Sequence, residues 1–224
     1  MFISSIFNCY CLSSVWAYYT QMERLIAELK KEGVLDSPAL EAAFRAVDRK
    51  DFVLPEYQSL AYENAPLPIG YGQTISQPYT VAFMLNLLAP SAGQRILDVG
   101  SGSGWTTALL AHIVGSAGRV YGIELIPELV AFGRNNLARY QFGHTTIEQA
   151  GALFGLPEEA PFDRILVSAA GTDVPGALLS QLSDTGILVI PVKNSIIKIQ
   201  KVPGQKPMRE VHEGFVFVPL IPKK

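Results

Sequence analysis

Apolar residues from Gln94 onward fall into two alternating patterns. Short runs rich in Val, Ile and Leu are typical of buried strands, and longer runs with apolar residues three and four positions apart are typical of helices. Strands and helices that alternate in this way favour a doubly wound sheet of parallel strands joined by right-handed crossovers. The strand runs are RILDV, RVYGIEL, HTTIEQ, FDRILVSAA and GILVIPV, and the helical runs are WTTALLAHIV, PELVAFGRNNLARY and PGALLSQL.

Different patterns flank this alternating segment. Residues 22–90 read mainly as helices, with Gly33 ending the first and Ser37-Pro38 beginning the second. Near the C-terminus, SIIKIQKV and GFVFVPL read as an antiparallel pair of strands. The predicted fold class is therefore α/β. We expect a Rossmann-like, doubly wound, mostly parallel seven-stranded sheet with an antiparallel C-terminal strand pair and an N-terminal helical extension.

The chain divides into three regions. Its 224 residues, of which 49% are apolar, suffice for one sizeable core, so residues 22–90 and 91–224 are expected to form a single domain, with the nucleotide-binding core in 91–224. Residues 1–21 lack Lys and Arg and are interrupted by Ser, Asn and Thr, which suits neither a secretory signal nor a membrane span. We expect Met22 to be the biological start and residues 1–21 to be extraneous or disordered. A weak membrane or export signal is the alternative.

Charge and cysteine content narrow the class of partner and the compartment. A net charge of -2 and a pI of about 5.9 do not show the excess of positive charge that is typical of proteins that bind nucleic acid. Cys9 and Cys11 form no disulfide framework, which fits a reducing compartment. The histidines His112, His144 and His212 are scattered and read as structural. We therefore expect a cytoplasmic monomer with no metal, no nucleic-acid partner and no stable membrane association.

The sequence LDVGSGSGW places Gly100, Gly102 and Gly104 directly between a strand and a helix. Glycines there let the backbone turn tightly and approach a ligand, beside the free N–H groups of the helix. A tight turn with no ligand would also account for these glycines. Glu124, however, ends the next strand about twenty residues further on, where an acidic side chain reaches the ribose hydroxyls of a nucleoside. Together these features predict a nucleoside site.

The surroundings of this turn favour S-adenosylmethionine over NAD as the ligand. The turn lacks the third glycine spacing of GxGxxG. Helical segments before the first strand and a strand pair that closes the sheet resemble class I methyltransferases, which use S-adenosylmethionine. Asp98, just before the turn, either holds the turn amides or helps to orient the methionine end of the cofactor, and a purely structural role stays open.

The segment LPIGYGQTISQP and several longer stretches, from about residue 22 to the end, resemble the protein-L-isoaspartate (D-aspartate) O-methyltransferase family. LPIGYGQTISQP is the most specific, since methyltransferases in general do not share it. The resemblance implies methyl transfer from S-adenosylmethionine to the α-carboxylate of L-isoaspartyl residues in damaged proteins, with S-adenosylhomocysteine as product. The ester then collapses to a succinimide, which partly reopens to aspartate. The longer stretches are AYENAPLPIGYGQTISQPYTVAFM, ILDVGSGSGWTTALLA, YGIELIPELVAFGRNNLAR, GLPEEAPFDRILVSAA, VPGALLSQLSDTGILVIPV and FVPL.

The implied reaction needs no side-chain base, metal or nucleophilic cysteine. A carboxylate is already a nucleophile at neutral pH, and a sulfonium is already a strong electrophile. Catalysis can therefore rest on alignment of the reacting atoms and exclusion of water.

By the resemblance, Ser76 is the catalytic residue, whose hydroxyl donates a hydrogen bond to the substrate carboxylate and does not act as a nucleophile. From the residues alone Ser76 also fits the cap of the helix opened by Gln77-Pro78, and the two roles are compatible. Gly70 and Gly72 let the segment bend across the pocket. The implied substrate-binding residues are Thr74, Ile75, Ser76, Gln77, Val167, Ser168 and Ala169, and the implied cofactor-binding residues are Gln73, Thr74, Asp98, Gly100, Ser101, Gly102, Ser103, Gly104, Glu124, Leu125 and Gly151.

The chain departs from the family pattern at several places. Where the family has an Asp that contacts the adenine amino group, the chain has Ala150, and Glu148 is a candidate substitute that no feature of the sequence supports. The Gly of the family's PVG is Lys193, an Arg often found before FVPL is Val216, and the acidic residue of AYED is shifted to Glu63. Two alternatives therefore stay open: a methyltransferase for another substrate, such as a small carboxylate or an RNA base, or a non-catalytic homologue with weakened cofactor binding.

Overall fold

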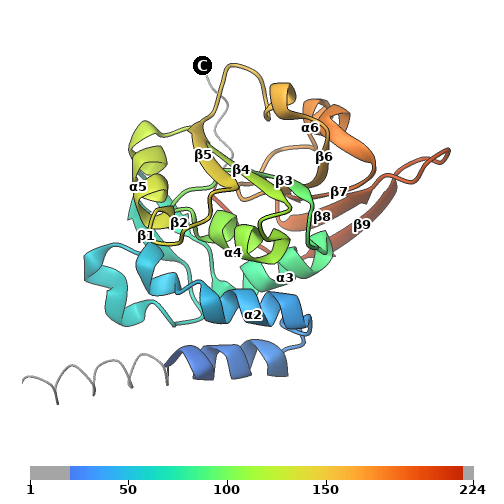
Figure 1. The fold of residues 1–224 in the computed structure, drawn as a ribbon. Coiled ribbons are helices and arrows are strands. Elements are labelled where there is room, and N and C mark those ends of the chain that lie inside the picture. The colour runs from blue at the N-terminus through green and yellow to red at the C-terminus, as the bar shows by residue number, and fades with distance from the viewer. Residues whose placement is uncertain (1–20, 219–224) are drawn as a thin grey trace, which may run out of the picture.

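Seven strands form one sheet in the computed structural model, which describes residues 21–218 (Figure 1). The strands are β3 (Arg95–Val99), β4 (Arg119–Glu124), β5 (Thr145–Gln149), β6 (Phe162–Val167), β7 (Leu182–Val192), β8 (Ser195–Gln200) and β9 (Met208–Glu213). Their order is β5-β4-β3-β6-β7-β8-β9. The strands from β5 to β7 run parallel, while β8 is antiparallel to both of its neighbours. The predicted fold class is confirmed.

Helices cover both faces of this sheet (Figure 1). They are a helix over residues 21–31, α2 (Pro38–Ala46), α3 (Pro78–Leu88), α4 (Trp105–Val114), α5 (Pro127–Leu137) and α6 (Gly176–Gln181). The first five pack with one set of sheet side chains, which includes Ile96 and Val120, and α6 packs with the alternate set, which includes Leu97 and Tyr121. Both faces of the central strand β3 are therefore buried, which explains why its apolar residues Ile96, Leu97 and Val99 do not alternate with exposed polar ones.

The prediction that GFVFVPL forms the last strand of the sheet is wrong. SIIKIQKV corresponds to β8, but its partner is β9 and not GFVFVPL. β9 lies at the edge of the sheet, and five of its six side chains are exposed. An edge strand exposed in this way carries no apolar alternation that would mark it in the sequence.

The apolar stretch after β9 packs against a helix instead. Phe215 stacks on Phe83 of α3, with the ring centroids 5.0 Å apart. The Val218 carbonyl accepts a hydrogen bond of 2.9 Å from the Ala170 N–H, which lies just beyond β6. Residues 214–218 therefore return to the carboxyl end of the sheet. Residues 219 and 220 of the predicted strand lie outside the described residues.

The N-terminal region contains more than the predicted helices. Two short 3-10 helices, η1 (Arg49–Phe52) and η2 (Pro55–Leu60), follow α2, and a hairpin of β1 (Leu67–Gly70) and β2 (Gln73–Ile75) precedes α3. Tyr71 and Gly72 form its turn with φ of 55° and 72°. Positive φ at both central residues is the geometry of a tight hairpin turn. Strands of four and three residues are too short to show the alternation that would reveal them in a sequence.

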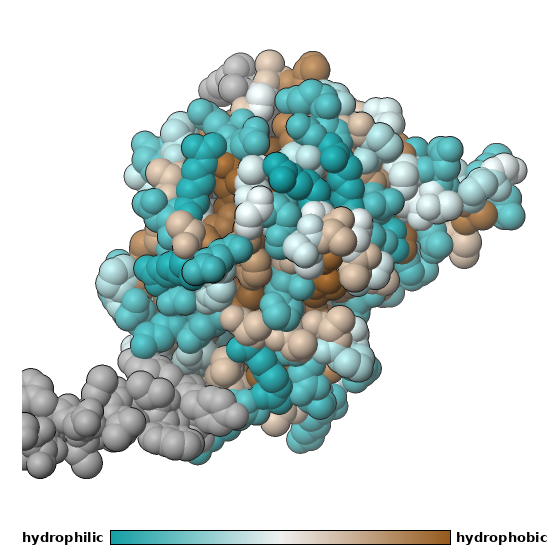
Figure 2. All heavy atoms as spheres, in the orientation of Figure 1, coloured by the Kyte–Doolittle hydropathy of each residue, from teal (hydrophilic) through white to brown (hydrophobic). Residues whose placement is uncertain are grey.

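The N-terminal helices and the sheet share one apolar core, which includes Leu29, Phe44 and Trp105. Figure 2 shows mostly hydrophilic residues on the outer surface of one face, with apolar atoms visible mainly in the recesses between them. Residues 1–20 of the segment predicted to be extraneous lie outside the described residues. Within residues 21–218, no helix has the length and apolar character that crossing a membrane requires.

Lys193 lies in the turn between β7 and β8 with a φ of 55°. This left-handed conformation costs a residue with a Cβ about 1–2 kcal/mol, whereas glycine adopts it readily. We expect Lys193→Gly to raise the free energy of unfolding by about 1 kcal/mol and Tm by about 2–4 °C. Differential scanning calorimetry measures the change. Lys193→Ala keeps the Cβ and is the matched control, so an equal Tm in the two variants would contradict the argument.

Candidate active site

The glycine-rich turn joins β3 to α4 at the carboxyl end of the sheet. The N–H groups of Gly100 and Ser101 both donate to the Ile123 carbonyl, at 2.8 and 3.1 Å, so the turn is tied to β4. Gly102 has a φ of 51°, and a Cβ there would lie 3.2 Å from Cδ1 of Ile69 in the β1–β2 hairpin. The turn and the hairpin therefore approach each other closely at a point where only glycine fits without adjustment.

Glu124, the last residue of β4, is 7% exposed and is held by two backbone groups. Its Oε2 accepts a hydrogen bond of 2.9 Å from the Gly102 N–H, and its Oε1 accepts one of 3.0 Å from the Ile126 N–H. Each carboxylate oxygen keeps a further lone pair for a ligand. Glu124 is thus both a brace for the glycine-rich turn and a fixed acceptor beside it.

Asp98 is fully buried beneath the turn. Thr107 Oγ1 donates to its Oδ2 at 2.6 Å, and Ser168 Oγ donates to its Oδ1 at 3.5 Å. Burial raises the pKa of Asp98 to about 6, against the opposing effect of the bonds from Thr107 and Ser168. The turn amides that form hydrogen bonds use other acceptors, among them the Ile123 carbonyl and Glu124. Asp98 therefore joins β3, α4 and the end of β6 and does not hold the turn amides.

Because Asp98 is buried, we expect the free energy of unfolding to fall as pH rises. Its folded-state pKa of about 6 exceeds the ordinary 3.8, so the folded state binds more protons than the unfolded state between these values. Stability from this group is therefore highest near pH 4 and declines up to about pH 6. Asp98→Asn removes the ionisation, and at pH 7 we expect it to be about 2 kcal/mol more stable than the wild type.

Urea unfolding of both proteins at pH 4, 5, 6 and 7 measures this difference, which should grow as pH rises. Asp184→Asn changes an exposed aspartate and is the control. A constant difference between wild type and Asp98→Asn across these pH values would contradict the prediction.

Ser76 follows the β1–β2 hairpin and precedes α3. Its hydroxyl makes no hydrogen bond to any described residue, and the N-cap position of α3 belongs to Gln77. Asn64 supplies the missing cap from a distant loop, because its Oδ1 accepts a hydrogen bond of 3.0 Å from the Tyr79 N–H. The expected cap role of Ser76 is therefore wrong, and its hydroxyl is left available to a ligand.

A cavity of about 260 Å³ lies between the hairpin, the glycine-rich turn and the carboxyl ends of β4, β5 and β6. Most of the residues that the sequence assigned to substrate or cofactor line this one space, although they come from five separate parts of the chain. Those that line it are Gln73, Thr74, Ile75, Ser76, Gly100, Ser101, Gly102, Ser103, Glu124, Leu125, Gly151, Ser168 and Ala169.

Four of the assigned residues lie outside the cavity lining. Asp98 is beneath the turn, and Val167 is buried in the core of the sheet. The Gln77 side chain donates to the Asn64 carbonyl at 3.0 Å. Gly104 is the N-cap of α4, and a Cβ there would lie 3.1 Å from the carbonyl of Gly133 in α5. These residues support the site from behind.

Sequence reasoning missed several lining residues. Trp105 opens α4, Ile69 comes from the hairpin, and Val218 arrives with the C-terminal segment. Ile69 and Val218 lie inside the quoted segments LPIGYGQTISQP and FVPL, so the family resemblance could have pointed to them. Trp105 lies inside the quoted segment ILDVGSGSGWTTALLA, but an aromatic residue at a helix start usually belongs to the core, so it was not assigned to the site.

One wall of the cavity is apolar throughout. It consists of the consecutive residues Ala150, Gly151, Ala152, Leu153, Phe154 and Gly155, which follow β5. Glu148 does not join them. It lines a separate groove along β5, with Arg134 and Tyr140. The proposed substitution of Glu148 for the missing Asp is therefore not supported, and Glu124 is the one acidic residue in the cavity lining.

The cavity fits S-adenosylmethionine by the chemistry of its lining. Ser101 and Trp105 line the cavity, and their buried side-chain atoms Oγ and Nε1 have no hydrogen-bond partner within residues 21–218. Glu124 offers fixed acceptor oxygens at the position where nucleoside-binding folds hold a ribose. The apolar wall suits the flat faces of a purine. In the same described residues, no group of three or more His, Cys, Asp or Glu side chains could hold a metal ion.

Comparison with known sequences places the chain among enzymes of one kind. A relative from Methanopyrus kandleri named protein-L-isoaspartate O-methyltransferase is 43% identical over 204 residues, which cover 89% of this chain and 90% of the relative. A relative of the same name from Aeropyrum pernix is 42% identical over 203 residues, covering 88% of this chain and 78% of the relative.

Solved structures and a family model agree with these relatives. A protein-L-isoaspartate O-methyltransferase from Plasmodium falciparum, crystallised with S-adenosyl-L-homocysteine, superposes with a TM-score of 0.77 at 26% identity and covers 89% of this chain and 98% of its own. A second structure of that name, with a TM-score of 0.80 at 24% identity, covers 89% of this chain and 65% of its own and shares the fold. The family model for protein-L-isoaspartate(D-aspartate) O-methyltransferase matches residues 20–224. The chain therefore belongs to the protein-L-isoaspartate(D-aspartate) O-methyltransferase family.

Proposed function

We propose that this protein transfers a methyl group from S-adenosylmethionine to the α-carboxylate of L-isoaspartyl residues in damaged proteins. One observation carries the proposal: the loop with Ser76 and the glycine-rich turn line the same cavity. The turn alone would support many methyltransferases, but the Ser76 loop is the segment that distinguishes this family. The relatives at 42% and 43% identity support the same substrate class.

The chain's own groups would hold the cofactor along the cavity. Glu124 would accept hydrogen bonds from ribose hydroxyls, since its two oxygens are already oriented by the Gly102 and Ile126 N–H groups. The wall from Ala150 to Gly155 would contact the purine. Ser101 Oγ and Trp105 Nε1 would find in the cofactor the partners that they lack in the protein.

The Ser76 end of the cavity would receive the substrate. When bound, S-adenosylmethionine supplies a methyl group on a positively charged sulfur and departs as S-adenosylhomocysteine. Ser76 donates a hydrogen bond to one oxygen of the substrate carboxylate and so orients the other oxygen, which forms the new bond to carbon. Ile69, Ile75 and Val99 line the cavity and exclude water from the reacting atoms. A carboxylate is ionised at neutral pH, so no protein base is needed.

The decisive experiment follows methyl transfer from labelled S-adenosylmethionine to an isoaspartyl peptide, with the aspartyl isomer as control. We expect labelling of the isoaspartyl peptide alone. Equal labelling of both peptides, or labelling of neither with intact cofactor binding, would point to another substrate. No binding of S-adenosylhomocysteine in calorimetry would point to a non-catalytic homologue.

Ala150 offers a test of how the purine is held. It lines the cavity next to Gly151, at the position where the family has an Asp that contacts the adenine amino group. We expect Ala150→Asp to tighten S-adenosylhomocysteine binding by about fivefold, which corresponds to about 1 kcal/mol for one added hydrogen bond. Isothermal titration calorimetry measures the change, and Ala150→Asn is the uncharged control. Weaker binding to Ala150→Asp would mean that the purine amino group lies elsewhere.

We further infer that the protein acts as a cytoplasmic monomer without a nucleic-acid partner, with residues 22–224 as its single domain. The net charge of -2 and the apolar core shared by the N-terminal helices and the sheet support this inference. Light scattering on a size-exclusion column should give a mass near 24.4 kDa for the full 224-residue chain. A mass twice as large would overturn the monomer.

A further inference from the structure

Arg49, in η1, is a buried arginine that binds only backbone oxygens. Arg49 is 2% exposed. Its Nη1 and Nη2 donate to backbone carbonyl groups of two later segments, the loop 61–65 and Ser76. Nη1 donates to the Ala61 carbonyl at 2.7 Å and to the Glu63 carbonyl at 3.3 Å, and Nη2 donates to the Ala65 carbonyl at 2.9 Å and to the Ser76 carbonyl at 3.1 Å. One side chain therefore joins the loop 61–65 to Ser76, a residue that lines the cavity.

No carboxylate neutralises this guanidinium within residues 21–218. Burial lowers the pKa of Arg49 to about 9. Its other close partner is the ring of Trp105, 5.3 Å from the guanidinium carbon to the ring centroid. A buried cation without a counter-ion is costly unless surrounding dipoles compensate it. The carbonyl oxygens of the two segments are therefore pulled toward one point.

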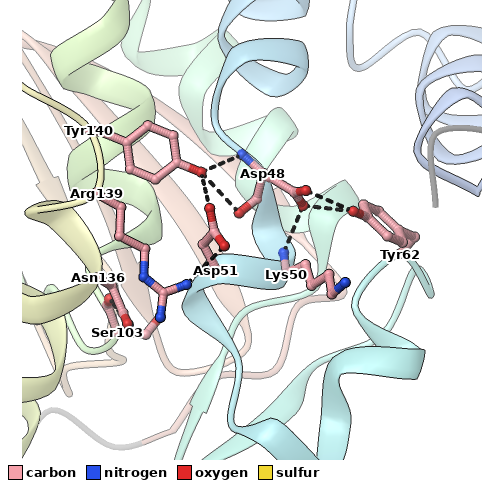
Figure 3. A network of polar contacts seen from close by, with 8 residues as sticks. All are labelled: Asp48, Lys50, Asp51, Tyr62, Ser103, Asn136, Arg139 and Tyr140. Atoms are coloured by element: carbon pink, nitrogen blue, oxygen red, sulfur yellow. Dashed lines mark hydrogen bonds and ion pairs between the residues drawn. The ribbon is translucent and has the colours of Figure 1, made fainter. Parts of the chain in front are cut away.

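The backbone that carries Arg49 is itself anchored from both sides. Figure 3 shows the Tyr140 hydroxyl between Asp48 and Asp51, and it accepts from the Asp48 N–H at 2.9 Å and donates to Asp51 Oδ2 at 2.8 Å. On the other side, the Tyr62 hydroxyl donates to Asp48 Oδ1 at 2.7 Å. The residues before and after Arg49 are thus held against the end of α5 and against the 61–65 loop.

Asn64 forms a second link between the loop 61–65 and the residues that follow Ser76. The side-chain Oδ1 of Asn64 accepts a hydrogen bond from the Tyr79 N–H, and the backbone carbonyl of Asn64 accepts one of 3.0 Å from Gln77 Nε2. Asn64 lies within the loop 61–65 that Arg49 holds, and its partners Gln77 and Tyr79 follow Ser76 by one and three residues. Arg49 and Asn64 together leave the backbone at Ser76 little freedom, while the Ser76 hydroxyl itself stays unbonded within the described residues.

We propose that Arg49 is a positioning residue for methyl transfer, which places the Ser76 hydroxyl by fixing the Ser76 carbonyl to the loop 61–65. The proposal rests on the proposed function, because it acts through the contact of Ser76 with the substrate carboxylate. Arg49 does not line the cavity, and its four hydrogen bonds go to the backbone of the loop 61–65 and of Ser76. Its expected effect is therefore on substrate affinity rather than on cofactor affinity.

A double-mutant cycle of Arg49→Lys and Ser76→Ala tests the role. Lysine keeps the positive charge but offers a single nitrogen, which cannot span four carbonyl groups. We expect Arg49→Lys to raise KM for an isoaspartyl peptide about tenfold and to change the Kd of S-adenosylhomocysteine by less than about threefold. In the Ser76→Ala background the same change should lower kcat/KM by less than about threefold, because the hydroxyl that Arg49 places is gone. Arg45→Lys, on the exposed face of α2, is the matched control and should leave all three quantities unchanged.

The outcomes separate the two proposals. If Arg49→Lys lowers kcat/KM by the same factor with and without the Ser76 hydroxyl, or weakens S-adenosylhomocysteine as much as the peptide, the positioning role is overturned. If Arg49→Lys does not fold, Arg49→Gln takes its place in the cycle, and equal factors in the two backgrounds overturn the role in the same way. A wild-type protein that binds S-adenosylhomocysteine but does not methylate isoaspartyl peptides overturns the proposed function, and the role of Arg49 with it.

Discussion

Gly102→Ala is expected to raise the Kd of S-adenosylhomocysteine about 100-fold, which corresponds to about 2.7 kcal/mol. Gly102 lines the cavity at a φ of 51°, and a Cβ there would lie 3.2 Å from Cδ1 of Ile69. The Ile69 side chain or the turn would have to give by a few tenths of an ångström. Any shift of the turn also displaces the Gly102 N–H from Glu124 Oε2, to which it donates at 2.9 Å. The substitution therefore disturbs two walls of the site at once. Isothermal titration calorimetry measures the loss.

Gly115→Ala provides the matched control for backbone strain. Gly115 ends α4 with a φ of 64°, and a Cβ there would meet nothing within 4 Å. Gly115 has a ψ of -176°, so alanine there enters a backbone region that is essentially confined to glycine. We expect Tm to fall at least as far in Gly115→Ala as in Gly102→Ala, but S-adenosylhomocysteine binding to stay unchanged in Gly115→Ala. Equal binding in the two variants would show that Gly102 is needed for the turn alone and not for the ligand.

Ser76→Ala is expected to lower kcat/KM for isoaspartyl peptides by about 10- to 150-fold, the range for one hydrogen bond to a charged group. Its Tm and its Kd for S-adenosylhomocysteine should stay within error of the wild type. Stability is spared because Asn64, and not Ser76, caps α3. Initial rates at varied peptide concentration, together with calorimetry, give all three quantities.

Ser76→Thr keeps a hydroxyl and is the informative partner of this variant. A partial return of activity in Ser76→Thr would assign the loss in Ser76→Ala to the hydroxyl and not to the shape of the loop. A change of less than threefold in Ser76→Ala would mean that the substrate carboxylate is bound by other groups. It would favour a methyltransferase with a different substrate.

Features that depend on neighbours in the sequence were predictable. The central strand β3 is buried on both faces, so its apolar run is visible without any structure. The glycine-rich turn and Glu124 were also readable, since a strand, a turn, a helix and the next strand are consecutive and their spacing is set by chain geometry. Strand β9 could not be predicted in this way, because an exposed edge strand has no buried face that would impose a pattern of apolar residues.

Features that join distant segments were decided by the tertiary structure. The sequence could place Ser76 before a helix but could not show that Asn64, twelve residues earlier, accepts the Tyr79 N–H and leaves the Ser76 hydroxyl without a hydrogen bond within the described residues. Nor could it show that Arg49 gathers four carbonyl groups, because backbone carbonyls are present at every residue and leave no mark in the residue pattern.

The same division holds for the whole protein. By itself the sequence determined the α/β fold, the cofactor turn and the family-specific loop, because burial, helix periodicity and tight turns each constrain residue types locally. Only the tertiary structure decided that Asp98, Gly104, Gln77 and Val167 stand behind the cavity while Trp105 and Val218 line it. Which side of a packed element faces a ligand depends on the crossing of segments far apart in the chain, and no local pattern encodes that crossing.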